Sequence, residues 1–338
     1  TWIQILAIFI IILLTYINTK GLKNGKILQD LFTTSKILAL LGIIIFGFIL
    51  VKNSQWSGNM SFNWNAFQDF GQEVGNDLVP TGWKSIGGIT LLGGIAAAMV
   101  GSVFSSVAWE NVTFVSGEIE NPKKNVVKSM VLGTIVVMVL YMLVNFVYLH
   151  ALDRNGIAFA DKNRPAVAAS EVIFGSIGTI IMAVLVMVST FGCINGLVLA
   201  GARVFQTMAK DGLFFKSAIE NNQNNVPGKS LWMQGIWASV LALSGQYGDL
   251  LDMISFVIVL FYMITVFGVI YLRIKKPNLE RPYKTWLYPV TPILYLIIGT
   301  AFCALLIFFK PQYTWPGFIL ILLGLPVYLF INRKNKIE

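Results

Sequence analysis

The chain has 338 residues, of which 56% are hydrophobic and only 12% are charged, and its mean hydropathy is +0.72. Soluble domains carry about 25% charged residues, so this composition excludes a soluble enzyme, a disordered chain and a secreted disulfide scaffold. The net charge of +9 would suggest nucleic-acid binding in a soluble protein. In a membrane protein, basic loops on one side of the bilayer explain it better.

Apolar segments recur along the whole chain at lengths near the ~20 residues that a helix needs to cross a bilayer. Nine are predicted as spans, at residues 2–18, 27–51, 89–117, 126–150, 176–202, 231–244, 250–272, 286–309 and 315–331. Backbone groups in lipid must be hydrogen-bonded within their own segment, so we predict helices rather than strands. The chain is therefore predicted to be an all-α polytopic membrane protein.

The basic residues predict the orientation of these spans. Most of the 25 Lys and Arg residues lie in one set of alternate loops and in the C-terminal tail, for example at 20–26, 123–128 and 333–336. The positive-inside rule places these loops and the C-terminus in the cytoplasm. We therefore predict a multi-pass protein of the plasma membrane or inner membrane.

Lys36 is the basic residue that falls outside this pattern. It follows Thr33, Thr34 and Ser35 in the second segment, about 14 Å along the helix from its start. An ionisable group at this depth costs about 2.5–3.5 kcal/mol and usually faces a cavity or a partner. Snorkelling to the interface is the weaker alternative. A buried lysine could relay a proton or act as a fixed cation in place of a bound metal ion, and both alternatives stay open.

The third segment, residues 89–117, is longer than the hydrocarbon core and polar in its middle, where Glu110 lies. Transporters often bind substrate where a span is broken at the midplane. We therefore predict a discontinuous span that lines a cavity, with a tilted continuous helix as the alternative. Phe104 and Trp109 are either core aromatics or gates of that cavity.

Polar groups in two further places are candidates. Ser189 and Thr190 in the fifth segment either serve helix packing or partner the Lys36 ammonium. Helix exits are predicted at residues 117–124 and 209–212. Both stretches combine glycine with acidic residues, and the first also contains proline. Glu118 and Glu120 are then loop residues or part of an inner gate stabilised by ion pairs.

Several of these stretches together resemble a known family. They are FSSVAWEN at 104–111, GEIENP at 117–122, STFGCING at 189–196 and AKDG at 209–212. They are similar to the broken sixth span, the loop after it and later motifs of the amino acid–polyamine–organocation superfamily, near its L-type amino-acid transporter branch. The second half of the chain, with ERPYK at 280–284, is similar as well.

The resemblance implies a leucine-transporter-like fold of twelve spans, with two inverted five-helix repeats and two appended helices. The nine predicted spans match the fourth to the twelfth, so the first three would lie upstream. Residues 1–338 then form one transmembrane domain: 1–51 end the first repeat, 89–272 form the second and 286–332 form the appended helices. The glycine-rich segment that binds the substrate carboxylate in the family's first span has no match here.

The resemblance also implies roles for the candidate residues. Phe104 matches the aromatic gate, and Trp109 and Glu110 match the side-chain pocket, although many relatives carry Asn at the position of Glu110. The unwound backbone facing the substrate amino group matches Ser105, Ser106 and Val107. Lys36 resembles the lysine that replaces a sodium ion, with Ser189 or Thr190 as partners.

The implied function is sodium-independent secondary transport of L-amino acids, by exchange or proton coupling, without a cofactor, metal or nucleic-acid partner. The alternative is a non-transporting scaffold or accessory subunit, or a fragment that is inert alone. A membrane enzyme is disfavoured, because one His, two distant Cys and one deep Glu form no catalytic cluster. The two cysteines, Cys193 and Cys303, are predicted to be packed or lipid-embedded thiols.

Overall fold

The computed structural model describes residues 2–61, 67–74, 77–114, 116–243, 247–281 and 283–335, and it is predominantly helical there. One long helix corresponds to each predicted span. These are α1 (Trp2–Thr19), α2 (Leu22–Leu50), α4 (Gly88–Ser105), α6 (Pro122–Ala151), α9 (Gly178–Lys210), α10 (Gly228–Leu241), α11 (Tyr247–Lys275), α12 (Val290–Phe309) and α13 (Pro311–Asn335). The predicted all-α membrane architecture is thus confirmed.

Among the described residues, seven helical segments are long and apolar enough to cross a membrane. The other two long helices fall short for different reasons. α10 has only 14 residues, and the apolar part of α13, Thr314–Pro326, is shorter than a full span. The predicted span that corresponds to α10, residues 231–244, is also only 14 residues long.

Short elements lie in the connections. They are α3 (Trp56–Met60), α5 (Asn111–Phe114), the 3-10 helix η1 (Ser116–Glu118), α7 (Arg154–Ala158), η2 (Asp161–Asn163), α8 (Pro165–Phe174), η3 (Gly175–Ile177) and η4 (Lys216–Ala218). The long loop after α2 also holds an antiparallel hairpin of β1 (Phe67–Val74) and β2 (Asp77–Ser85), paired from Phe67↔Ser85 to Val74↔Asp77. The sequence reasoning placed only a loop here.

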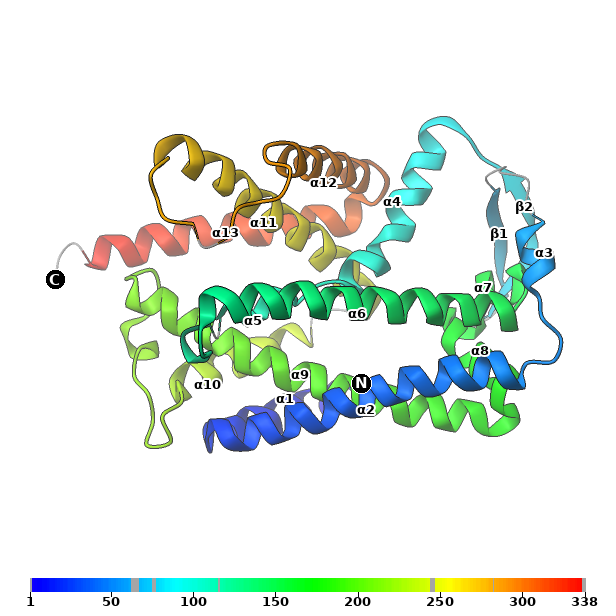
Figure 1. Ribbon diagram of the computed structural model, residues 1–338, viewed down its shortest axis with the longest axis horizontal. Helices are drawn as coiled ribbons and strands as arrows, with labels where there is room; N and C mark the ends of the chain where they lie inside the picture. Colours follow the sequence, from blue (N-terminus) through cyan, green and yellow to red (C-terminus); the bar gives the residue numbers. More distant parts are fainter. Residues whose placement is uncertain are drawn as a thin grey trace.

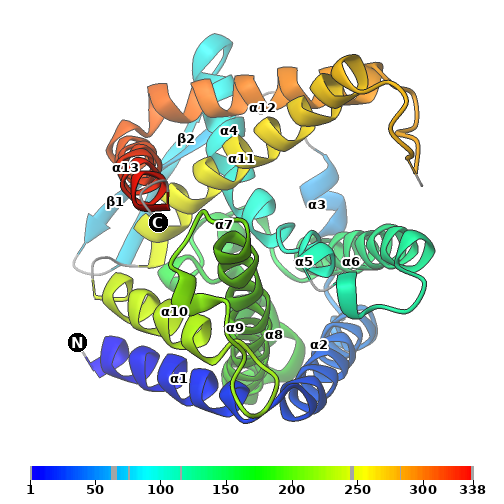
Figure 2. The ribbon, with the colours of Figure 1, turned by 90° about the vertical axis from the view of Figure 1, so that its left-hand side faces the viewer.

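The long helices form two groups, which Figure 2 shows with α11 and α12 running across the view and α9 and α13 seen nearly along their axes. In the first helix group, α9 packs against α1, α2, α8 and α10, and α6 packs on α2. In the second helix group, α11 packs against α4, α12 and α13. The segment after α4 passes from the second group to the first, where α5 contacts α6 and α9. This segment is the broken third span.

Each group has its own apolar core. Leu140, Val147 and Met182 are buried in the first, between α2, α6, α8 and α9. Phe256 and Phe302 are buried in the second, between α4, α11 and α12, together with Cys303. Cys303 is thus the packed thiol that the sequence predicted.

The predicted helix exits are present. At the end of α9, the amide of Gly212 donates to the Ala209 carbonyl and that of Leu213 donates to the Met208 carbonyl. Gly212 has a φ of 74°, so these bonds form a Schellman motif, which glycine favours because it has no Cβ. At the other exit, Pro122 is the first residue of α6, where its missing N–H costs nothing.

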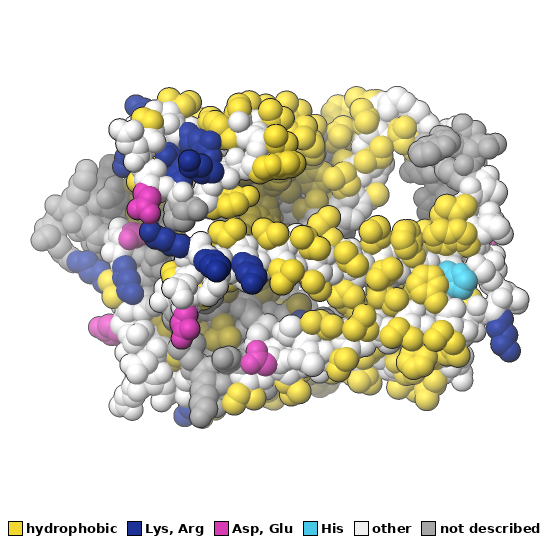
Figure 3. All heavy atoms as spheres, in the orientation of Figure 1, with side chains coloured by type: hydrophobic (Ala, Val, Ile, Leu, Met, Phe, Trp, Pro, Cys, Tyr) yellow, Lys and Arg dark blue, Asp and Glu magenta, His cyan; other side chains and the backbone are white. Residues whose placement is uncertain are grey.

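Charge gathers at one end of the bundle. Figure 3 shows most of the visible Lys and Arg side chains at the end where α13 and the loop after α9 lie, whereas hydrophobic side chains cover the middle. The hairpin, α3, α7 and α8 lie at the opposite end (Figure 1). At the basic end, the Lys229 ammonium bonds the Glu220 carboxylate and lowers its pKa. This pair forms at neutral pH and is lost as the pH falls through that lowered value.

Candidate functional site

The helix interruption follows Ser105. The Ser106 amide donates to the carbonyls of Ser102 and Val103, at 3.2 and 3.1 Å, which tightens the last turn of α4. The chain then runs non-helically until α5 begins at Asn111. The predicted discontinuity is therefore present, at the position that the polar residues indicated.

Ala108 holds this interruption in an unusual conformation. Its φ is 71°, in the left-handed region that glycine favours. A residue with a Cβ pays roughly 1–2 kcal/mol there, and a β-branched residue is less tolerated still. The interrupted backbone thus holds local strain at a non-glycine position.

We expect Ala108→Gly to be at least as stable as the parent protein and Ala108→Val to be less stable by about 1–2 kcal/mol. Thermal unfolding of the purified protein in detergent measures both. Equal stability of the Val variant and the parent would contradict the strain at this position.

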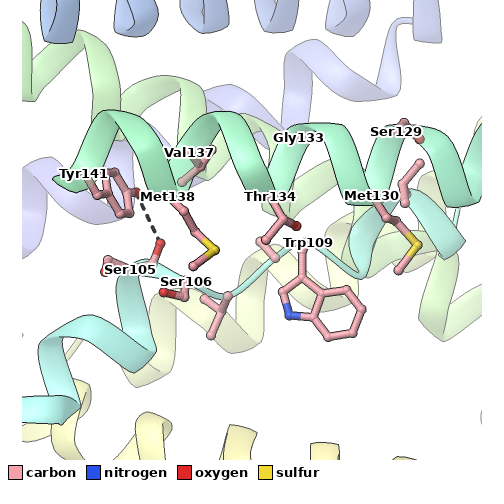
Figure 4. Close-up of a pocket in the computed structure, with 13 residues that line it drawn as sticks. Ser105, Ser106, Trp109, Ser129, Met130, Gly133, Thr134, Val137, Met138 and Tyr141 are labelled. Carbon is pink, nitrogen blue, oxygen red and sulfur yellow. Dashed lines mark hydrogen bonds between the residues drawn. The ribbon is translucent and has the colours of Figure 1, made fainter. Parts of the chain in front are cut away.

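A cavity of about 290 Å³ lies between the interruption and α6. The interruption contributes its backbone and the side chains of Ser105, Ser106, Val107 and Trp109. Figure 4 shows Thr134, Met138 and Tyr141 of α6 directed toward this segment. The Tyr141 hydroxyl donates a 3.2 Å bond to the Ser105 carbonyl. The cavity therefore combines apolar walls with hydroxyl groups and unwound backbone.

A second cavity, of about 540 Å³, lies on the other side of the interruption, between α4, α11 and α12. Ser106 and Trp109 line both cavities. The remaining wall is mostly apolar, with Tyr262, Thr265 and Tyr295 as its polar groups. The broken span thus separates two cavities, each large enough to hold part or all of a small-molecule ligand.

Glu110 connects the interruption to α11. The Tyr262 hydroxyl donates a 2.7 Å hydrogen bond to Oε2 of the half-buried Glu110. The ring centroids of Trp109 and Tyr262 are 5.5 Å apart. Tyr262 therefore contacts two adjacent residues of the predicted site, although the sequence reasoning did not select it.

Lys36 lies at the midpoint of α2 and is half-buried. Its ammonium donates a 3.1 Å hydrogen bond to the Cys193 sulfur on α9. The expected partners are placed differently: Thr190 donates to the Val186 and Met187 carbonyls of its own helix, and Ser189 is half-buried one turn before Cys193. The Cys193 thiol therefore bonds the Lys36 ammonium where a serine or threonine hydroxyl was expected, because Cys193 lies on the face of α9 that is turned toward α2.

Of the two predicted gate acids, Glu120 takes no part in the ion pair found near it. The Glu118 side chain lies outside the described residues, and Glu120 is exposed, with only its carbonyl bonded, by Asn125. The ion pair at this end joins Lys123 and Glu280 at 2.9 Å, with both side chains exposed. It connects the start of α6 to the loop after α11.

The sequence reasoning selected one aromatic residue that lies apart from the cavities and missed others that line them. Phe104 is half-buried in the last turn of α4 and lines neither cavity. Tyr141 and Tyr262 line one cavity each. A signal for Tyr262 was available: Thr265 follows it by three residues, which puts two polar groups on one face of an apolar helix.

Long apolar helices in two groups, joined by an interrupted span with cavities on both sides, are the architecture of a multi-pass membrane protein. The chain belongs to the amino acid permease family, which matches residues 1–330. This confirms the resemblance drawn from the sequence.

Individual relatives agree with the family. The chain is 29% identical to the serine/threonine exchanger SteT of Bacillus subtilis over 98% of this chain and 70% of that protein. It is 28% identical to the large neutral amino acids transporter small subunit 2 of Homo sapiens, over 96% of this chain and 57% of that protein. It is 27% identical to the Asc-type amino acid transporter 1 of Mus musculus, over 98% and 59%. The chain thus spans less than two thirds of these mammalian relatives.

Proposed function

We propose that the full-length protein is a secondary transporter that carries L-amino acids across the membrane. The observation that carries this proposal is the broken span α4–α5, with a cavity on each side, in a chain of the amino acid permease family. Free backbone groups at such a break can bind the charged ends of an amino acid. The names of the exchanger and transporter relatives support this substrate class.

Substrate binding is assigned to the interruption. The backbone of Ser105, Ser106 and Val107 would face the substrate amino group, with Trp109 and Glu110 shaping the side-chain pocket. Phe104 is retained as a gate on the family resemblance alone, since it is half-buried in the last turn of α4 and lines neither cavity.

Alternating access would come from rocking of the two helix groups against each other. Their separate cores support rigid-body motion, because each group keeps its own packed interior. The repeat assignment, with residues 1–51, 89–272 and 286–332 as its parts, belongs to the same proposal.

Lys36 is proposed as the fixed cation that makes transport independent of sodium. Its ammonium lies between α2 and α9, and a second cation at the same place would be repelled. Ser189 and Thr190 would join it only in another state, because Cys193 is its partner here. Coupling is then by exchange or by protons.

The basic end of the bundle is proposed to face the cytoplasm, together with the C-terminus. The gathering of Lys and Arg at that end supports this orientation (Figure 3). Glu118 and Glu120 would then lie at the inner opening, beside the Lys123–Glu280 pair.

Uptake by proteoliposomes that contain the full-length protein tests the proposal. We expect uptake of some members of a radiolabelled L-amino-acid panel, unchanged when choline replaces sodium, and stimulated by internal amino acid or by a pH gradient. A scaffold would give well-inserted protein without uptake of any amino acid. Uptake that requires sodium would contradict the role of Lys36.

A further inference from the structure

The Glu110 carboxylate lacks a counter-charge in the described part of the chain. Its Oε2 accepts the 2.7 Å bond from Tyr262. The ion pairs found there, Lys123–Glu280, Arg164–Asp161 and Lys229–Glu220, lie elsewhere. A neutral hydroxyl is thus its side-chain partner, and its second oxygen remains available.

The carboxylate also lies deep. Tyr262, its partner, is near the middle of the 29-residue helix α11, and Glu110 itself is half-buried. A carboxylate at this depth is costly unless a cation or a proton neutralises it. The described residues thus supply no positive charge here, and a cation or a proton from outside them would stabilise the carboxylate.

The adjoining cavity of about 540 Å³ suits an extended side chain that ends in a cation. Apolar residues such as Met99 and Val259 line it and can pack on methylene groups. Glu110 is not itself a lining residue, but Tyr262 lies in the wall and bonds its carboxylate, and the lining residue Trp109 precedes Glu110 in the chain. The carboxylate therefore lies directly behind this part of the wall. The Trp109 ring, 5.5 Å from that of Tyr262, adds an aromatic surface that attracts cations.

We propose that Glu110, positioned by Tyr262, selects amino acids whose side chain carries an ammonium or guanidinium group. This inference rests on the proposed transport function and adds the charge of the substrate.

The experiment compares two substrates of nearly the same shape in proteoliposomes with the full-length protein: arginine, which is cationic, and citrulline, which is neutral. We expect the parent protein to prefer arginine by roughly 10- to 100-fold in kcat/KM, the range of a charge-assisted hydrogen bond. In Glu110→Gln the ratio of the two kcat/KM values, arginine over citrulline, should fall toward one, whatever the variant does to uptake as a whole.

Tyr262→Phe is the second variant, because it removes one hydroxyl and little volume. If Tyr262 positions the carboxylate, this variant should raise the KM for arginine more than that for citrulline. A merely structural role would change both substrates alike. Binding of each substrate to the detergent-purified variants, measured by thermal shift, keeps the test valid where a variant inserts poorly.

Four results would overturn the inference. Equal uptake of arginine and citrulline by the parent, or an arginine preference that survives in Glu110→Gln, excludes charge selection while leaving amino-acid transport intact. Uptake of neutral amino acids that depends on pH through Glu110, without arginine preference, assigns the carboxylate to a proton. Absence of uptake of every amino acid would overturn the transport proposal and this inference together.

Discussion

Lys36→Ala in the full-length protein is expected to lower amino-acid uptake by more than about tenfold, while membrane insertion stays near that of the parent. The ammonium is the fixed positive charge between α2 and α9, at the midpoint of α2. Its partner here is a neutral thiol, so the alanine variant removes the charge itself rather than an ion pair. A loss of about 1.4 kcal/mol in transition-state stabilisation already lowers a rate tenfold. Initial rates of uptake into proteoliposomes, normalised to inserted protein, measure the effect.

Two further variants separate the charge from its local contact. Cys193→Ala removes only a weak sulfur acceptor and should keep most of the activity. Lys36→Arg keeps the charge but replaces a compact ammonium with a planar fork, so partial activity is expected. Uptake by Lys36→Ala at the parent rate would exclude Lys36 from the transport cycle.

The spans were predictable because each depends on its own residues. Runs of apolar side chains predicted α2 and α6 almost to their ends, and Gly212 marked the exit of α9. The interruption after Ser105 was predictable for the same local reason, since hydroxyl side chains and Glu110 weaken an apolar helix. Local signals thus located both the helices and the break.

Which side chains meet in the site depends on how each helix is rotated about its own axis. No local pattern in the sequence encodes this rotation. Lys36 meets Cys193 across 157 residues, and Glu110 meets Tyr262 across 152. A hydroxyl one turn along α9 was as plausible from the sequence as the thiol. The hairpin β1–β2 was missed because its pairing depends on register between two short, mixed-polarity segments.

Gly192 controls how closely α2 approaches α9, and its replacement should have the largest effect on stability. An added Cβ at Gly192 would lie 2.5 Å from Cβ of Phe32 and 3.4 Å from Cε of Lys36. The Phe32 Cβ is fixed to the backbone of α2 and cannot turn away, so the helices must separate. Overpacking of this kind costs typically 1–3 kcal/mol. We expect Gly192→Ala to lower the free energy of unfolding by that amount and Gly192→Leu to reduce the yield of folded protein.

Gly42→Ala is the matched control, because Gly42 lies on α2, the helix that Gly192 of α9 contacts, and an added Cβ there meets no described atom within 4 Å. This variant should unfold at the parent temperature or above it, since alanine favours helix more than glycine does. Gly192→Ala should also reduce uptake, because separation of α2 from α9 moves the Lys36 ammonium away from Cys193. If Gly192→Ala matched Gly42→Ala in unfolding and in uptake, the close contact of the two helices would not be what positions Lys36.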